Sequence, residues 1–227
     1  FTKHYDNVFV PPAVGDEGQA IGTYMHCDCV VNNNIHKSET FAGQEYEHNV
    51  GTQADYKKIA QEIADGKIVG WFQGKSESGN RALGNRSILA DPRNPDIKDI
   101  INDTIKLRED FRPFAPAVLE EHYKEYFDTR LPSPYMSRIC KVKADADKVP
   151  GIVHVDGTAR IQTVNRKFNQ KFYDIINEFY KITGIPMLLN TSFNCQEPIV
   201  ETPEHAIRTF KRTALDILVI NDRVICK

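Results

Sequence analysis

The feature that most constrains the fold is the alternation of short apolar runs with amphipathic segments after residue 53. Helix-like spacing marks Ala54–Asp65, Asp96–Lys106, Phe168–Thr183 and a segment opened by Thr202-Pro203. The strand-like runs are Lys67–Gln73, Pro116–Leu119, Ile139–Val142, Arg160–Val164, Pro186–Asn190, Asp216–Ile220 and Arg223–Cys226. Such alternation predicts an α/β fold with a twisted sheet covered by helices. Because the last two runs are joined only by Asn221-Asp222, we expect a hairpin there and a mixed sheet.

The first 52 residues do not follow this alternation. Asn7–Val10 reads as the end of a strand, and Glu17–Cys29 reads as a helix with Asp16 placed to cap it. Residues 30–52 are polar and rich in Asn and Gly, which predicts a linker. The sequence opens on Phe1 without a signal-peptide pattern, and this start suggests part of a longer protein.

Composition excludes several classes of protein. Twenty-nine Lys and Arg against 31 Asp and Glu give a net charge of -2, which argues against a general nucleic-acid binder. No apolar run approaches the roughly 20 residues that a membrane-spanning helix needs. Five cysteines, at positions 27, 29, 140, 195 and 226, do not form the pattern of a disulfide framework. We therefore expect a cytoplasmic protein.

The segment from Gly74 to Ser87 has the densest chemical signal. It follows a predicted strand, has glycines at five-residue spacing, and carries Lys75, Arg81 and Arg86. Glycine lets backbone N–H groups approach an anion, and arginine offers paired donors that match phosphate. The segment lacks the Gly-Lys-Ser/Thr ending of a Walker A loop. It predicts phosphate binding, and the alternative is a glycine-rich turn with solvated cations.

Three further clusters have similar character. Arg108 and Arg112 lie beside aromatic residues and prolines, although pairing with Glu109 or Asp110 would also account for them. The other two clusters are 154–162 and 190–194, and each also reads as a polar turn. Since ligands of α/β sheets bind beyond strand ends, four such clusters together favour a site for a polyanion.

Several of these motifs together closely resemble the NodU/CmcH-type O-carbamoyltransferases. The matching stretches are Gly70-Trp-Phe-Gln-Gly74, Arg81-Ala-Leu-Gly-Asn-Arg-Ser-Ile-Leu-Ala-Asp-Pro92, Phe111-Arg-Pro-Phe-Ala-Pro116, His154-Val-Asp-Gly-Thr-Ala-Arg160, Leu189-Asn-Thr-Ser-Phe-Asn194, Glu197-Pro-Ile-Val200 and Thr202-Pro203. Two departures are Ser78-Gly-Asn-Arg81, where the family commonly has Phe-Gly-Pro-Arg, and a shorter loop after Asn194. The resemblance covers essentially the whole chain.

This resemblance implies a division of the chain into three parts. Residues 53–227 resemble the family's YrdC-like domain, which makes carbamoyl-adenylate from carbamoyl phosphate and ATP. Residues 1–29 resemble the tail of an amino-terminal transfer domain of the actin/Hsp70 type, and residues 30–52 join the two. Asp16 matches the family's metal-ligating aspartate. Its histidine partners lie outside this sequence, so the resemblance implies iron in the full-length protein only and magnesium with ATP here.

The resemblance also suggests roles for the clustered residues. The candidate catalytic residues are Arg81, Arg86 and Arg112, which with Lys75 would hold phosphates. Candidates for the carbamoyl amide and the ribose are Asn85, Ser87, Asn190 and Ser192. Other substrate-binding candidates are Arg108, His154, Asp156, Thr158, Arg160 and Asn194.

The implied function is the activating step of an ATP-dependent O-carbamoyltransferase, with the acceptor hydroxyl unidentified. The implied partners are carbamoyl phosphate, ATP and the transfer domain, with neither a membrane nor nucleic acid. Two alternatives remain open. One is a stand-alone YrdC-type threonylcarbamoyl-adenylate synthase using bicarbonate and threonine. The other is a non-catalytic nucleotide- or RNA-binding module.

Overall fold

Ten strands form one sheet in the part of the chain that the computed structural model describes, residues 10–36, 39–143 and 147–227. The strand order is β1-β10-β9-β2-β3-β8-β4-β7-β6-β5. In chain order, the strands are β1 (Thr52–Gln53), β2 (Val69–Phe72), β3 (Arg86–Ala90), β4 (Ala115–Leu119), β5 (Phe127–Asp128), β6 (Arg138–Val142), β7 (Thr158–Val164), β8 (Met187–Ser192), β9 (Ile217–Ile220) and β10 (Arg223–Cys226).

The sheet is mixed, as the sequence predicts. β2 pairs in parallel with β9, and β4 pairs in parallel with β7. β3 is antiparallel to both of its neighbours, β2 and β8. The expected hairpin between β9 and β10 is present, with Asn221 in the left-handed region at φ 53°. β2, β3 and β4 are buried at every position, so both faces of the central sheet are covered.

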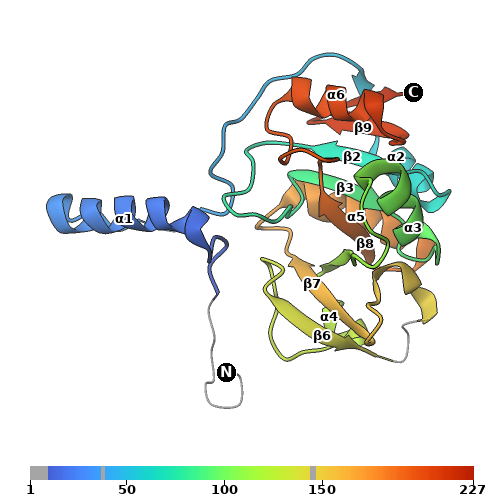
Figure 1. Cartoon of the computed structure of the whole chain (residues 1–227), viewed down its shortest axis with the longest axis horizontal. Helices are drawn as coiled ribbons and strands as arrows, with labels where there is room; N and C mark the ends of the chain where they lie inside the picture. The colour runs from blue at the N-terminus through green and yellow to red at the C-terminus, as the bar shows by residue number, and fades with distance from the viewer. Residues whose placement is uncertain (1–9, 37–38, 144–146) are drawn as a thin grey trace.

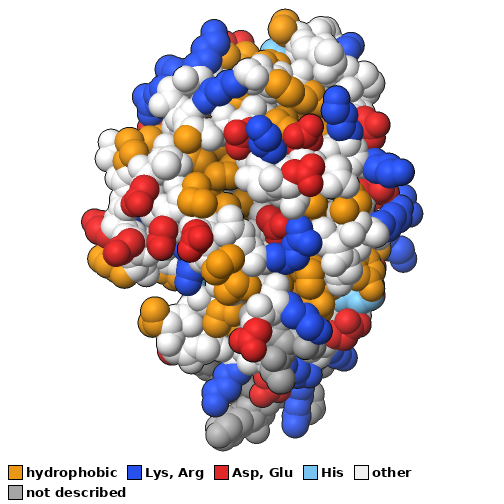
Figure 2. Space-filling view, turned by 90° about the vertical axis from the view of Figure 1, so that its right-hand side faces the viewer, with side chains coloured by type: hydrophobic (Ala, Val, Ile, Leu, Met, Phe, Trp, Pro, Cys, Tyr) orange, Lys and Arg blue, Asp and Glu red, His pale blue; other side chains and the backbone are white. Residues whose placement is uncertain are grey.

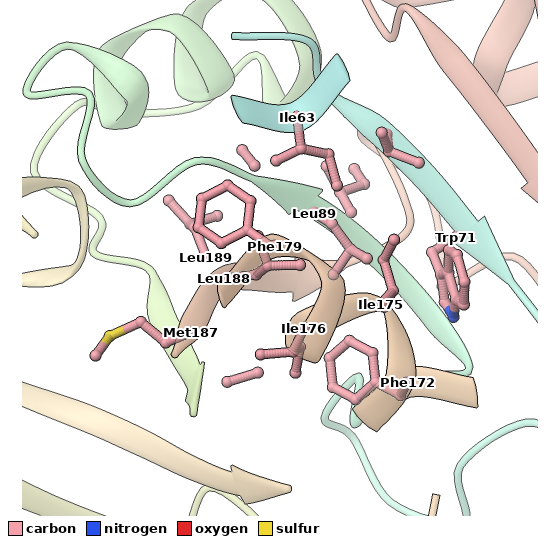
Figure 3. Close-up of a cluster of buried hydrophobic side chains, with 14 of the residues drawn as sticks. Ile63, Trp71, Leu89, Phe172, Ile175, Ile176, Phe179, Met187, Leu188 and Leu189 are labelled. Carbon is pink, nitrogen blue, oxygen red and sulfur yellow. The ribbon is translucent and has the colours of Figure 1, made fainter. Parts of the chain in front are cut away.

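Helices and apolar strand residues form the core together. The helices are η1 (Asp16–Gly18), α1 (Gln19–Asn32), α2 (Tyr56–Ala64), α3 (Ile97–Ile101), η2 (Asn102–Lys106), α4 (Tyr123–Tyr126), η4 (Pro150–Ile152), α5 (Gln170–Thr183) and α6 (Pro203–Arg212). α5 turns Phe172, Ile175, Ile176 and Phe179 toward the sheet, where they meet Leu89 and other apolar side chains (Figure 3). No helix among the described residues is both long and apolar enough to span a membrane.

The amino-terminal helix differs from the expectation. α1 runs to Asn32 rather than Cys29, buries none of its residues, and projects away from the sheet (Figure 1). The prediction that Asp16 caps this helix is wrong. Asp16 is the first residue of the 3-10 turn η1, with Gly15 in the cap position, so its carboxylate lies within the turn and accepts a hydrogen bond from Gln19 Nε2 at 3.0 Å. Of the predicted strand end, residues 7–9 lie outside the described part.

Residues of the predicted linker lie along the glycine-rich segment. Gly43 N donates to Ser76 O at 3.2 Å, and Ser78 N donates to Thr40 O at 2.8 Å. Phe41 forms an isolated antiparallel bridge with Glu77. The segment 39–43 is therefore part of the packing around residues 76–78, while the proposed division into domains stays a prediction.

Two elements near the predicted site differ from the sequence-based expectation. β3 begins at Arg86, within the segment that the sequence presented as a glycine-rich loop. The predicted helix Asp96–Lys106 is instead the short α3 followed by the π-helix η2. The next residue, Leu107, lies in the left-handed region with φ 49°.

Candidate functional site

A pocket of about 410 Å³ lies where several loops meet near the ends of β7 and β8. Among the described residues, its walls carry five cationic side chains and one carboxylate, Glu109. The cations are Arg81, Lys106, Arg108, Arg112 and Arg160. Asn190, Ser192, Asn194 and Cys195 also line it. Such an excess of donors and positive charge suits a ligand with several anionic oxygens.

Lys106 is the most buried cation of the pocket, with 2% of its surface exposed. Its Nζ donates to the carbonyl oxygen and the Oγ of Ser192, the latter at 3.2 Å. It also donates to Asn194 O at 3.1 Å and to Asn194 Oδ1 at 2.7 Å. Burial first, and the positive charge of Arg108 second, lower the pKa of Lys106 to about 7. The ammonium is therefore held in place and readily loses its proton near neutral pH.

The end of η2 aims the neighbouring arginines at the pocket. Asn102 is fully buried, and its Oδ1 accepts a hydrogen bond from Arg108 Nε at 2.8 Å. Its Nδ2 donates to the carbonyl oxygens of Asp110 and Arg112 at 3.3 and 3.2 Å. The left-handed backbone of Leu107 makes the turn between Lys106 and Arg108. A non-glycine residue in this conformation is strained, a feature that often accompanies functional sites.

Arg108 also lies 4.8 Å from the centre of the Phe114 ring, and burial lowers its pKa to about 10, with Arg112 as the next cause. Arg112 is half exposed, and its nearest carboxylate oxygen, on Glu109, is 3.9 Å away. An exposed ion pair at this distance neutralises the charge of the arginine only weakly. The guanidinium of Arg112 is therefore available to a ligand.

Arg81 and Arg160 line the same pocket and lie close enough for their charges to interact. Arg160 lies on β7, and its Nε is buried without a hydrogen-bond partner among the described residues. Its pKa is lowered by burial first and by the charge of Arg81 second. Two like charges brought together around an unpaired donor cost free energy, which an anion between them would recover.

Glu77 organises the loop that carries Arg81. Its Oε1 accepts hydrogen bonds from the backbone N–H groups of Leu83, Asn85 and Arg86, at 2.7, 2.8 and 3.2 Å. Burial raises the pKa of Glu77, although these backbone donors act in the opposite direction. The carboxylate thus ties the glycine-rich segment into one conformation.

The pocket brings together seven of the residues predicted from the sequence. They are Arg81, Arg108, Arg112, Arg160, Asn190, Ser192 and Asn194. Lys106 and Cys195 line the pocket too, although the sequence predicts a role for neither. The signal for Lys106 was present in its position two residues before Arg108, within the same cation-rich segment.

Arg86 lies elsewhere, although its type and spacing match those of Arg81. It is fully buried, and its guanidinium lies 3.6 Å from the centre of the Phe72 ring. It donates to the carbonyl oxygens of Gln73, Asn85 and Gly74, at 2.8, 3.0 and 3.1 Å. These contacts give Arg86 a role in holding strand ends together, and direct substrate contact by Arg86 stays a prediction.

The other candidates also lie outside the pocket. Lys75 is exposed, and Ser87 is buried with its Oγ accepting from Gly84 N at 3.1 Å. Asn85 donates from Nδ2 to Lys75 O at 2.7 Å and borders a different hollow.

The cluster before β7 forms a local turn. Asp156 Oδ1 accepts from Thr158 N and Oγ1 at 3.0 and 2.6 Å, and His154 Nδ1 lies 3.2 Å from Thr158 Oγ1. None of these three side chains lines the pocket. Asp16 is exposed, and no group of three or more potential metal ligands occurs among the described residues.

Five cations against one carboxylate distinguish this pocket from three larger hollows among the described residues. Two of them, of about 910 and 990 Å³, have acidic and basic side chains together on their walls. The third, of about 490 Å³, lies on α6 and is lined by Arg208, Lys211 and Arg212 with Glu204. Figure 2 shows Lys and Arg interspersed with Asp and Glu on the face that it presents. The cations of the 410 Å³ pocket are therefore a local concentration rather than part of a broadly basic surface.

The chain is similar to a known protein family along most of its length. Residues 60–227 match the family model described as "Carbamoyltransferase C-terminus". Nodulation protein NolNO of Sinorhizobium fredii is 41% identical over 98% of this chain and 36% of its own length. Nodulation protein NolO of Bradyrhizobium diazoefficiens is 40% identical over 98% of this chain and 45% of its own length. The chain thus spans less than half of the length of each of these relatives.

A solved structure shares the fold. The crystal structure of full-length HypF in its phosphate- and nucleotide-bound form superposes with a TM-score of 0.53. The match covers 82% of this chain and 23% of HypF, at 19% sequence identity. This likeness supports the mixed sheet covered by helices that the sequence predicted.

Proposed function

The chain belongs to the carbamoyltransferase carboxy-terminal family, and we propose that it forms the activating part of an ATP-dependent O-carbamoyltransferase. Its reaction would convert carbamoyl phosphate and ATP to carbamoyl-adenylate, for transfer to an acceptor hydroxyl by the part of the protein outside this sequence. The observation that carries the proposal is the gathering of Arg81, Lys106, Arg108, Arg112 and Arg160 on one small pocket.

The chemistry explains the need for so many cations. Water releases carbamate and phosphate from carbamoyl phosphate, and a carbamate oxygen then attacks the α-phosphorus of ATP and displaces pyrophosphate. Both substrates are polyanions, so they repel each other unless positive charge lies between them. Carbamate decomposes in water, and a sheltered pocket would pass it to ATP before that happens.

We assign the roles by position. The four arginines of the pocket, Arg81, Arg108, Arg112 and Arg160, would bind the phosphate groups. Lys106 would fix the loop at Asn194 and add the most buried charge. Arg86 would support this site by holding strand ends rather than by touching phosphate.

The residues present suit magnesium only as a companion of ATP. Glu109 is the one carboxylate on the pocket wall among the described residues, so the phosphates themselves would supply most of the metal's oxygen ligands. The described residues do not fit an iron site, because they hold no group of three or more His, Cys, Asp or Glu side chains close together.

The test is to follow phosphate and pyrophosphate with each substrate alone and with both together. We expect pyrophosphate release to require both carbamoyl phosphate and ATP. Release that instead requires bicarbonate and threonine would identify a threonylcarbamoyl-adenylate synthase. Tight ATP binding without any release would indicate a non-catalytic nucleotide-binding module.

Two arginine variants connect this reaction to the pocket. Arg81→Ala and Arg112→Ala should each lower pyrophosphate release about ten- to hundredfold, because each removes a charge-assisted contact worth roughly 1.5–3 kcal/mol. Arg130→Ala is the matched control, since Arg130 is exposed and outside the pocket. Near-normal release by both pocket variants would place the reaction elsewhere.

A further inference from the structure

Asn190 belongs to a chain of amide side chains whose orientation is fixed. It lies on β8 with 1% of its surface exposed, and its Nδ2 donates to Ala82 O at 3.1 Å and to Gln162 Oε1 at 2.8 Å. Gln162 Nε2 in turn donates to Leu83 O at 2.8 Å. Main-chain carbonyls only accept hydrogen bonds, so both amide nitrogens must face them. Turning the Asn190 amide over would bring its oxygen against two other acceptors.

This arrangement leaves one acceptor unused. Asn190 Oδ1 is buried, and no donor among the described residues reaches it. Asn190 nevertheless lines a pocket whose other polar side chains are mostly donors, including Lys106 and Arg160. A buried acceptor without a donor costs free energy, and a ligand with an N–H group could recover it. Asn190 thus brings a fixed, unpaired acceptor to the wall of a pocket that is rich in cations.

We propose that Asn190 Oδ1 accepts a hydrogen bond from the carbamoyl amino group, and that this contact selects carbamoyl phosphate over acyl phosphates. The inference rests on the proposed function and adds to it the atom that recognises the carbamoyl end. In acetyl phosphate, a methyl group replaces the amino group while the charge and shape remain similar. Bound in the same way, it would leave Oδ1 without a partner, which is an effective way for a site to reject an analogue.

The position of Asn190 favours the carbamoyl group over the amino group of adenine. Asn190 and Ser192 lie on the same face of β8, about 7 Å apart along the strand. Lys106 Nζ contacts Ser192, and Asn190 lines the same pocket as this buried cation. In carbamoyl phosphate only a carbon and an oxygen separate the nitrogen from the phosphorus. The adenine amino group lies at the opposite end of ATP from its phosphates.

The test compares the affinities of the full chain for carbamoyl phosphate and acetyl phosphate by calorimetry, without nucleotide and at low temperature to limit hydrolysis. We expect the unmodified chain to prefer carbamoyl phosphate by about tenfold or more, which corresponds to ~1.4 kcal/mol. Asn190→Leu should reduce this preference to about one. If Asn190 has only a structural role, the substitution should lower the affinities for carbamoyl phosphate and acetyl phosphate alike and leave their ratio unchanged. Asn190→Ala carries the same expectation if the leucine variant does not fold.

Gln162→Leu is the matched control. Gln162 belongs to the same amide chain but does not line the pocket, and Asn190 remains bonded to Ala82 in this variant. It should lose stability while keeping the preference for carbamoyl phosphate. A parallel comparison of ATP with inosine triphosphate, which lacks the amino group of adenine, tests the other source of an N–H donor.

The outcomes separate this inference from the proposed function. If the unmodified chain binds carbamoyl phosphate but Asn190→Leu keeps its preference, the inference is overturned and the proposed function stands. If Asn190→Leu loses only the preference for ATP over inosine triphosphate, the acceptor recognises adenine and the inference is also overturned. If the unmodified chain does not bind carbamoyl phosphate at all, both fail together.

Discussion

Replacing Lys106 by methionine should remove a link between anion binding and proton uptake. Burial holds the pKa of Lys106 at about 7, so much of the free protein carries a neutral amine at pH 8. An anion about 4 Å away would favour the ammonium by roughly 4 kcal/mol per unit charge at an effective dielectric constant of 20. Binding should therefore raise the pKa and take up a proton above pH 7.

The magnitude follows from the two pKa values. Sulfate is a suitable probe because it carries the same charge from pH 6 to pH 9. The protonated lysine binds sulfate more strongly, so affinity should be highest below the free pKa of about 7 and should fall as pH rises. If binding raises the pKa to about 8–10, affinity falls about ten- to hundredfold between pH 6 and 9. Lys106→Met should abolish most of this fall.

The lowered pKa of Lys106 should also make the free energy of unfolding depend on pH. The unfolded chain has the ordinary lysine pKa of 10.5, above the folded value of about 7, so it binds more protons between these two values. The free energy of unfolding should therefore rise with pH through this window. Denaturant titrations of the unmodified chain and of Lys106→Met should show that the rise is smaller in the variant.

Calorimetry in two buffers with different ionisation enthalpies would measure the proton uptake directly. Cys195→Ser is the control, because Cys195 lines the same pocket and the substitution leaves the Lys106 ammonium in place. The reasoning would be refuted by a sulfate affinity that does not change with pH in the unmodified chain. An equal pH dependence in Lys106→Met would refute it as well.

Two further predictions concern packing near the pocket. Gly84→Ala should lower the free energy of unfolding by about 2–5 kcal/mol in a denaturant titration, because φ is 110° there and an added Cβ would lie 2.2 Å from Phe172 Cδ1. A variant as stable as the unmodified chain would contradict that contact. Arg86→Met should lower it by roughly 2–5 kcal/mol as well, because several buried carbonyl oxygens lose their donor. Loss of phosphate affinity at unchanged stability would instead support direct substrate contact by Arg86.

Much of the fold could be predicted from the sequence because strong local patterns agree with the tertiary structure. α5 follows the predicted Phe168–Thr183 closely, since its apolar residues recur at helical spacing and Gly184 ends it with a left-handed backbone. α6 begins where Thr202 and Pro203 indicated, and Thr202 Oγ1 accepts from His205 N at 3.3 Å. β3 is not evident in the sequence because its first two residues, the polar Arg86 and Ser87, belong to the glycine-rich segment.

The site could be predicted by residue type but not by side-chain direction. Arg81 and Arg86 look alike in the sequence, yet one lies on a loop beside the pocket and the other begins a buried strand. Lys106 stands at the end of a predicted helix, where a lysine is ordinarily solvated. The π-helix and the left-handed Leu107 turn it inward instead, and these depend on contacts of Asn102 with residues 108–112. Such contacts between polar groups leave little trace in the spacing of apolar residues.

The parallel pairing of β2 with β9 ties the centre of the sheet to segments far apart in the sequence. Ile68 N, just before β2, donates to Asp216 Oδ2, just before β9, across 148 positions. Contacts of such separation require a large loop to close before they contribute, so refolding should be slow. The pocket draws on loops from four parts of the chain and should form only after this closure. An anion in the pocket should therefore slow unfolding while leaving the refolding rate nearly unchanged.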